Sequence, residues 1–259
     1  MAAKKKIGLA LSGGGARGFA HLGVLKVLVE NKIPIDMIAG TSAGSIVGGA
    51  FAAGMSVDEI LAMSRRVRYS NMMLPNLGVS GMFTNAPMGN FLSRYLPVKN
   101  IEEMTMPFAA VAFDLATSEM VVKKEDDLVT AIRASCAVPG VFAPVRDASG
   151  RRLVDGGVVS PTPINIVREM GADVVIAVDL MACGATFRKT SQTAMGIMIQ
   201  SAMTLLRVAG QSEHSNANLV IEPAIAHLRP DQIGKREEFL ELGLQAARTR
   251  INEIKAVVG

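Results

Sequence analysis

Two segments near the start of the chain carry residue types that suit acyl transfer. Residues 12–18 read Ser-Gly-Gly-Gly-Ala-Arg-Gly. Residues 40–44 read Gly-Thr-Ser-Ala-Gly, a G-x-S-x-G pattern with Ser42 at its centre. Acyl transfer needs a nucleophile and a set of N–H donors that stabilise the developing oxyanion. Ser42 can supply the nucleophile, and the backbone of the glycine-rich segment can supply the donors.

The elements around Ser42 are those that a nucleophile elbow requires. An apolar run at residues 35–39 predicts a strand, and residues 43–53 predict a helix that is rich in Gly and Ala. Small residues on this helix indicate very close packing against a sheet, because glycine is otherwise unfavourable in helices. At the start of the helix, Ser42 would also lie at the positive end of the helix dipole.

A serine is a poor nucleophile without a base, and the three histidines are weak candidates for that base. His214 and His227 follow Ser42 in the order expected of an α/β-hydrolase, but both lie among polar residues that predict a surface position. His21 falls one turn into the first predicted helix, where a buried structural role is expected.

Asp155 is a better candidate base than any histidine. It ends a short strand and precedes Gly156 and Gly157, which would leave its carboxylate projecting into a crevice. An Asp-Gly pair is also common in simple turns. Asp114 and Asp179 end strands as well, and they remain as alternatives.

A dinucleotide-binding site is a second interpretation of the first motif. Gly13, Gly15 and Gly18 spell G-x-G-x-x-G between a predicted strand and a predicted helix. That fingerprint requires an acidic residue near the end of the second strand. Ser42 stands there instead, and the nearest acid at a comparable distance, Glu30, precedes that strand. No Gly-Lys-Ser/Thr follows the glycines, so a P-loop is not predicted either.

Strands and helices alternate along almost the whole chain. This alternation predicts a mainly parallel sheet with helices on both faces, in one domain over residues 1–259. Residues 66–100 differ, because they hold many Gly, Pro and Met residues, and loops with short helices that cover a site are expected there. The other predicted strands are 7–11, 108–113, 120–122, 153–154, 174–178 and 219–221. The other predicted helices are 17–31, one opened by a capping box at 56–59, 126–135, 190–212 and 237–257.

Composition narrows the classes of protein to consider. Apolar residues make up 49% of the 259 residues and charged residues 19%, which supports a sizeable buried core. Cys136 and Cys183 are not at metal-ligand spacing, and a chain with few cysteines favours a cytoplasmic location. No metal and no cofactor is expected, and no signal peptide or membrane span is predicted.

The net charge of +4 is a mild bias. Nucleic-acid binding is not supported, because no set of aromatic residues accompanies the basic clusters. The clusters at residues 4–6, 65–68 and 151–152 are typical of a solvated surface. They would also suit peripheral contact with an anionic membrane surface.

Three motifs taken in order resemble the patatin-like phospholipase family. They are Gly-Gly-Gly-Ala-Arg-Gly at 13–18, Gly-Thr-Ser-Ala-Gly at 40–44 and Asp-Gly-Gly at 155–157. Residues 21–25, 134–135 and 138–145 are also similar to the family, so the likeness covers about residues 7–180. The family's first motif often begins with Asp, whereas this chain has Ser12.

The resemblance implies a fold, an activity and a set of site residues. The fold is a three-layer α/β/α sandwich. The activity is hydrolysis of carboxylic esters in phospholipids or other lipids, of a phospholipase A or lysophospholipase type, through a Ser–Asp dyad without histidine. Ser42 would be the nucleophile and Asp155 the base. An oxyanion hole would be formed by Gly13, Gly14 and Gly15 with help from Arg17. The glycines that support the motifs are Gly18, Gly40, Gly44, Gly156 and Gly157. A non-catalytic regulatory protein on the same fold remains as an alternative.

Overall fold

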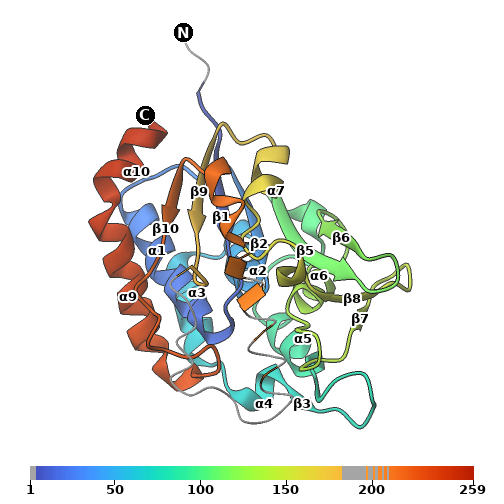
Figure 1. The fold of residues 1–259 in the computed structure, drawn as a ribbon. Coiled ribbons are helices and arrows are strands. Elements are labelled where there is room, and N and C mark those ends of the chain that lie inside the picture. Colours follow the sequence, from blue (N-terminus) through green and yellow to red (C-terminus); the bar gives the residue numbers. More distant parts are fainter. Residues whose placement is uncertain (1–3, 183–196, 198–200, 202–203, 206, 209) are drawn as a thin grey trace.

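An eight-stranded sheet forms the centre of the molecule in the computed structural model, which describes residues 4–182, 197, 201, 204–205, 207–208 and 210–259 (Figure 1). The strand order is β10-β9-β1-β2-β5-β8-β7, and β6 also pairs with β5. Neighbours from β10 to β5 run parallel, and β6, β7 and β8 are antiparallel additions at one side. The strands are β1 (Ile7–Leu11), β2 (Met37–Thr41), β5 (Phe108–Asp114), β6 (Glu119–Lys123), β7 (Val145–Arg146), β8 (Arg152–Asp155), β9 (Val174–Val178) and β10 (Leu219–Ile221).

Helices cover both faces of this sheet, as the alternating sequence pattern predicts. On β9, Val174, Ile176 and Val178 join a large core cluster that includes residues of α1 and α9, whereas Val175 and Ala177 join a smaller cluster with α7. Side chains alternate between the faces of a strand, so one apolar run fills both cores. The helices are α1 (Phe19–Glu30), α2 (Ala43–Ala52), α3 (Val57–Arg65), α6 (Leu128–Ser135), α7 (Ile164–Glu169), α9 (Arg236–Thr249) and α10 (Ile251–Val258). The three-layer α/β/α arrangement is thus confirmed.

Most predicted elements are present, with some changes at their boundaries. The capping box at Ser56 and Glu59 opens α3 as predicted. The second strand lies at Met37–Thr41 instead of 35–39, because pairing with β1 and β5 sets its register. The single helix predicted at 237–257 is wrong, since Arg250 (φ −102°, ψ 6°) separates α9 from α10. The helix predicted at 190–212 lies mostly outside the described residues.

The irregular segment predicted at 66–100 contains two short helices and a hairpin. These are α4 (Tyr69–Met72), β3 (Leu74–Pro75), β4 (Phe83–Thr84) and α5 (Ala86–Leu92). β4 also bonds to the loop after α6, through Phe83 N–H to Val141 O (2.9 Å) and Ala143 N–H to Phe83 O (2.8 Å). Within the described ranges, no helix combines the length and the apolar character needed to cross a bilayer.

Candidate active site

The register of β5 brings Ser42 and Asp155 to the same place. β2 and β8 both lie along the edge of β5 opposite β6, with Thr41 paired to Val111 and Asp155 paired to Ala112. The two motifs, more than 100 residues apart in sequence, therefore end at consecutive positions of one strand. The Thr41 hydroxyl also donates to Ser160 O (2.8 Å), which ties the end of β2 to the loop beyond Asp155.

Ser42 occupies a strained turn between β2 and α2. Its φ of 52° and ψ of −121° are rare for a residue with a side chain, and such strain is typical of a nucleophile elbow. The turn depends on close packing: a Cβ at Gly44 would lie 2.1 Å from Leu11 O, and one at Gly40 would lie 2.5 Å from Gly44 C. The Ser42 N–H donates to Ser135 Oγ at 2.8 Å.

Asp155 is buried beside Ser42, and only 6% of its surface is exposed. Burial raises the pKa of Asp155 to about 6, although the Gly157 N–H and the Ser42 side chain both favour the carboxylate through hydrogen bonds. The Gly157 N–H donates to Asp155 Oδ1 at 2.7 Å, and the Asp155 N–H donates to Ala137 O at 3.0 Å. A Cβ at Gly156 would lie 2.3 Å from Val111 O, so this glycine lets β8 end against β5. The arrangement holds a carboxylate that can accept a proton near neutral pH.

The glycine-rich segment lies against Ser42, but one of its N–H groups is already used. A Cβ at Gly13 would be 3.4 Å from Ser42 Cβ. The Gly13 N–H donates to Pro161 O at 2.9 Å, which corrects the expectation that Gly13 offers an oxyanion donor. Among the described residues, the Gly14 and Gly15 N–H groups have no acceptor. Gly14 is the N-cap and Gly15 the first residue of the 3-10 turn Gly15–Gly18 that leads into α1, a position where N–H groups suit an anion.

The Arg17 guanidinium is held by backbone carbonyls, which corrects the expectation that it helps to form the oxyanion hole. This guanidinium is buried and donates to Leu228 O from Nε (3.1 Å) and Nη2 (2.9 Å), and to Leu180 O from Nη1 (3.1 Å). The side chain thus ties the glycine segment to two distant parts of the chain. A Cβ at Gly18 would lie 2.7 Å from Ala43 Cβ, so the same turn also packs on the first residue of α2.

Ser12 and His21 support the glycine segment from within the core. Ser12 Oγ accepts from the Leu180 N–H (2.9 Å) and donates to Gly13 O (3.0 Å). His21 is fully buried, and its Nε2 donates to Ser12 O at 2.8 Å. Burial lowers the pKa of His21 to about 4, so the ring is neutral at pH 7. The buried structural role predicted for His21 is confirmed.

The alternative bases have other partners. Asp179 Oδ2 bonds to His214 Nε2 at 2.8 Å, and its Oδ1 accepts the Met181 N–H at 2.7 Å. Asp114 Oδ1 accepts the Ala116 N–H at 2.9 Å. His227 is exposed and bonds to Glu238, as its sequence context predicts.

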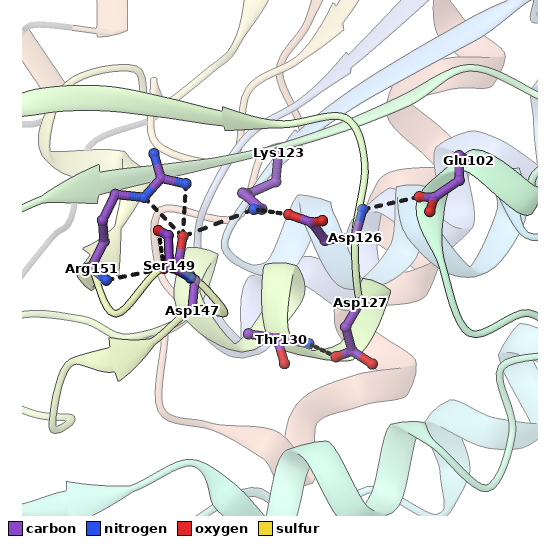
Figure 2. Close-up of polar contacts among 8 residues, drawn as sticks. All are labelled: Glu102, Lys123, Asp126, Asp127, Thr130, Asp147, Ser149 and Arg151. Atoms are coloured by element: carbon purple, nitrogen blue, oxygen red, sulfur yellow. Dashed lines mark hydrogen bonds and ion pairs between the residues drawn. The ribbon is translucent and has the colours of Figure 1, made fainter.

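A polar network secures the turn that leads into β8 and Asp155 (Figure 2). Asp147 is its centre: Oδ2 pairs with Arg151 Nη2 (2.7 Å), Oδ1 accepts from Ser149 Oγ (2.7 Å), and Lys123 Nζ lies 3.9 Å away. Burial would raise the pKa of Asp147, but the bonds from Ser149 and Arg151 outweigh it and hold the pKa at about 2. Asp147 is therefore ionised at neutral pH, and its contacts fix the β7–β8 turn.

Two supporting residues were not found as site residues from the sequence. Ser135 holds the Ser42 N–H, and Pro161 takes up the Gly13 N–H. The sequence could have pointed to Ser135, because residues 134–135 are among those that resemble the family. Nothing in the sequence points to Pro161. Among the side chains that the structure describes, no group of His, Cys, Asp or Glu is arranged to hold a metal ion.

The fold and this geometry define an α/β/α protein with a serine at a nucleophile elbow and a buried aspartate beside it. The chain belongs to the patatin-like phospholipase family, whose model matches residues 9–168. It is 37% identical over 181 residues to human patatin-like phospholipase domain-containing protein 6, covering 67% of this chain and 13% of that protein. It is 36% identical over 178 residues to an uncharacterized NTE family protein of Mycobacterium tuberculosis, covering 68% of this chain and 49% of the relative. This chain thus spans less than half the length of these relatives.

A solved structure shares the fold. The crystal structure of VipD from Legionella pneumophila matches with a TM-score of 0.53 at 14% identity, over 96% of this chain and 67% of that one. At this identity the likeness concerns the fold alone.

Proposed function

We propose that this protein is a serine acyl hydrolase that cleaves carboxylic ester bonds in phospholipids or related lipids. The observation that carries the proposal is the strained Ser42 beside a buried Asp155 with a pKa raised to about 6. Family membership supports a lipid ester as the substrate and gives no support to the dinucleotide alternative. A phospholipase A or lysophospholipase specificity is the form of this activity that the family name favours.

In the proposed mechanism, Asp155 takes the hydroxyl proton of Ser42 as Oγ attacks the ester carbonyl carbon. The carbonyl oxygen becomes an oxyanion that accepts hydrogen bonds from the Gly14 and Gly15 N–H groups. Collapse of this intermediate breaks the bond to the alcohol, which leaves with the proton held by Asp155. Water then attacks the acyl-enzyme while Asp155 accepts a proton from it, and Ser42 regains its hydroxyl as the fatty acid departs.

Labelling of Ser42 tests this function directly. We expect a serine-reactive fluorophosphonate to modify the wild-type protein once, at Ser42, and p-nitrophenyl butyrate to be hydrolysed. The Ser42→Ala variant should show neither reaction, while Ser64→Ala, which changes a buried serine of α3 that bonds to Leu61 O, should be labelled normally. Peptide mass spectrometry locates the adduct. A folded wild-type protein that is neither labelled nor active on short and long p-nitrophenyl esters would favour the regulatory alternative.

The rate of ester hydrolysis should depend on pH with a midpoint near 6. Asp155 must be ionised to accept a proton, so kcat/KM should fall about tenfold per unit below pH 6 and level off above it. A pH–rate profile measures this, with circular dichroism to show that the fold persists. His214→Gln should keep the same midpoint. If the His214→Gln variant did not show the fall in kcat/KM below pH 6, that fall would be due to His214 and not to Asp155.

A further inference from the structure

We propose that the protein docks on anionic phospholipid bilayers through one face that is both basic and apolar. This docking face consists of Arg66, Arg68, Arg94, Leu77 and Val79. The proposal rests on the lipid hydrolase function for its purpose, but the binding itself requires no catalysis.

The first observation is an unneutralised cluster of positive charge. The segment 60–101 contains no Asp or Glu and five basic residues: Arg65, Arg66, Arg68, Arg94 and Lys99. Every Asp and Glu of the chain lies within the described residues, and among these Arg65 pairs with Glu237 at 3.7 Å, whereas Arg66, Arg68 and Arg94 have no carboxylate partner. The Arg68 guanidinium donates from Nη1 to the backbone carbonyls of Arg65 and Val67, neither of which neutralises the charge.

The second observation is the apolar surface that accompanies these charges. Arg66, Arg68 and Arg94 line one open cavity of about 550 Å³, whose walls include Leu74, Phe91 and Tyr95. At the tip of the neighbouring β3–β4 hairpin, Leu77 and Val79 are fully exposed, at 103% and 108%.

This pairing of charge with apolar side chains indicates the kind of partner. Arginines meet the phosphates of headgroups, while aliphatic side chains enter the boundary between headgroups and acyl chains. A water-soluble polyanion would use the arginines but would leave the two aliphatic side chains in water. An anionic bilayer can bind the arginines and bury the aliphatic side chains at the same time, so it is the proposed partner.

The docking face is joined to the candidate active site by a short path through the fold. β4 bonds to the loop at Val141 and Ala143, and this loop follows the end of α6. There, Ser135 holds the Ser42 N–H and Ala137 holds the Asp155 N–H. Figure 1 shows α4, β3 and α5 together at the end of the molecule away from the N-terminus, the end toward which β1 runs. Docking there would bring the candidate active site close to the lipid.

Sedimentation with vesicles tests the proposal. The Ser42→Ala variant of the full chain would be used, so that no lipid is hydrolysed. We expect binding to vesicles of phosphatidylcholine mixed with phosphatidylglycerol, and much weaker binding to phosphatidylcholine alone. Replacing the three arginines of the docking face with glutamine should weaken binding about fivefold for each charge removed, and should reduce its salt dependence.

A matched variant removes the same charge from another part of the surface. Lys4, Arg248 and Lys255 are exposed and, among the described residues, form no ion pair. Lys4 precedes β1, Arg248 lies in the last turn of α9 and Lys255 lies in α10. Figure 1 shows α10 and both termini at the end of the molecule opposite α4 and β3. Changing these three to glutamine should leave vesicle binding within about twofold of the parent, because they lie away from the docking face.

Two further variants test the contribution of the apolar side chains to vesicle binding. Leu77→Ser with Val79→Ser should lower vesicle binding about tenfold. Leu115→Ser with Met120→Ser, which changes other exposed apolar side chains, should not. In the background with Ser42 intact, all these variants should hydrolyse p-nitrophenyl butyrate as the wild type does.

Several outcomes would overturn the docking proposal. The first is that the protein does not bind anionic vesicles, and the second is that the docking-face and control variants lose vesicle binding equally. The third is that the arginines are needed for retention on an immobilised oligonucleotide, while their replacement leaves vesicle binding unchanged. Docking without any ester hydrolysis would instead refute the proposed function and leave the docking face standing.

Discussion

Replacing Asp155 with asparagine is expected to lower kcat/KM for ester hydrolysis by about 10²–10⁴-fold, the range typical of a lost general base. Asparagine keeps an oxygen that can accept the Gly157 N–H, which lies 2.7 Å from Asp155 Oδ1. It cannot take the proton of Ser42. The loss should therefore appear in kcat, measured with p-nitrophenyl butyrate, while circular dichroism remains unchanged.

The same variant should become relatively more stable as the pH rises. The pKa of Asp155 is raised to about 6 in the folded state, so its stabilising contribution is present below its unfolded pKa and is lost as the pH rises through 6. Asparagine does not titrate. Between pH 4 and pH 7 the unfolding free energy of Asp155→Asn should gain about 2 kcal/mol relative to the wild type. Urea unfolding at both pH values measures this change.

Asp114→Asn is the matched control. Asp114 is also buried at the end of a strand, and its carboxylate also accepts the N–H two residues further on. This variant removes a similar local interaction without touching Ser42, and we expect it to retain activity. If Asp155→Asn stays active while Asp114→Asn does not, Asp155 is not the base.

The sequence predicts the strands and both ends of the proposed dyad because these signals are local. β1 and β9 are short apolar runs, and β9 is observed at the residues predicted, Val174–Val178. Ser42 and Asp155 each follow such a run and precede glycine-bearing turns, so their positions at strand ends could be inferred. Their approach to each other depends on the register of β5, which pairs with both strands. No local pattern encodes that register.

The details of the glycine segment are non-local for the same reason. The Gly13 N–H is taken by Pro161, and Arg17 reaches Leu180 and Leu228, between 148 and 211 residues away in sequence. The sequence shows a flexible backbone rich in donors, but tertiary contacts decide which donors stay free. The β3–β4 hairpin was also not predicted, because it is stabilised by the distant loop at Val141.

Gly15→Ala is expected to lower kcat by about 10²–10³-fold, the usual effect of losing one oxyanion donor. Gly15 has a φ of +57°, which disfavours any side chain, and a Cβ there would lie 2.6 Å from Pro230 O. The backbone must therefore shift, and the Gly14 and Gly15 N–H groups would move with it. Single-turnover acylation by a p-nitrophenyl ester measures the effect, and labelling of Ser42 by fluorophosphonate should slow in parallel.

Gly171→Ala separates this effect from backbone strain alone. Gly171 has a φ of +99° and open space around its Cβ position, and it precedes β9, whereas the site lies beyond the carboxyl ends of β1 and β2. Both variants should lose stability because alanine is strained at a positive φ, but only Gly15→Ala should lose activity. Equal activity in the two variants would mean that the oxyanion is stabilised elsewhere. If acylation slows in Gly15→Ala alone, although Ser42 and Asp155 are unchanged, the loss of activity is due to displacement of the Gly14 and Gly15 N–H donors.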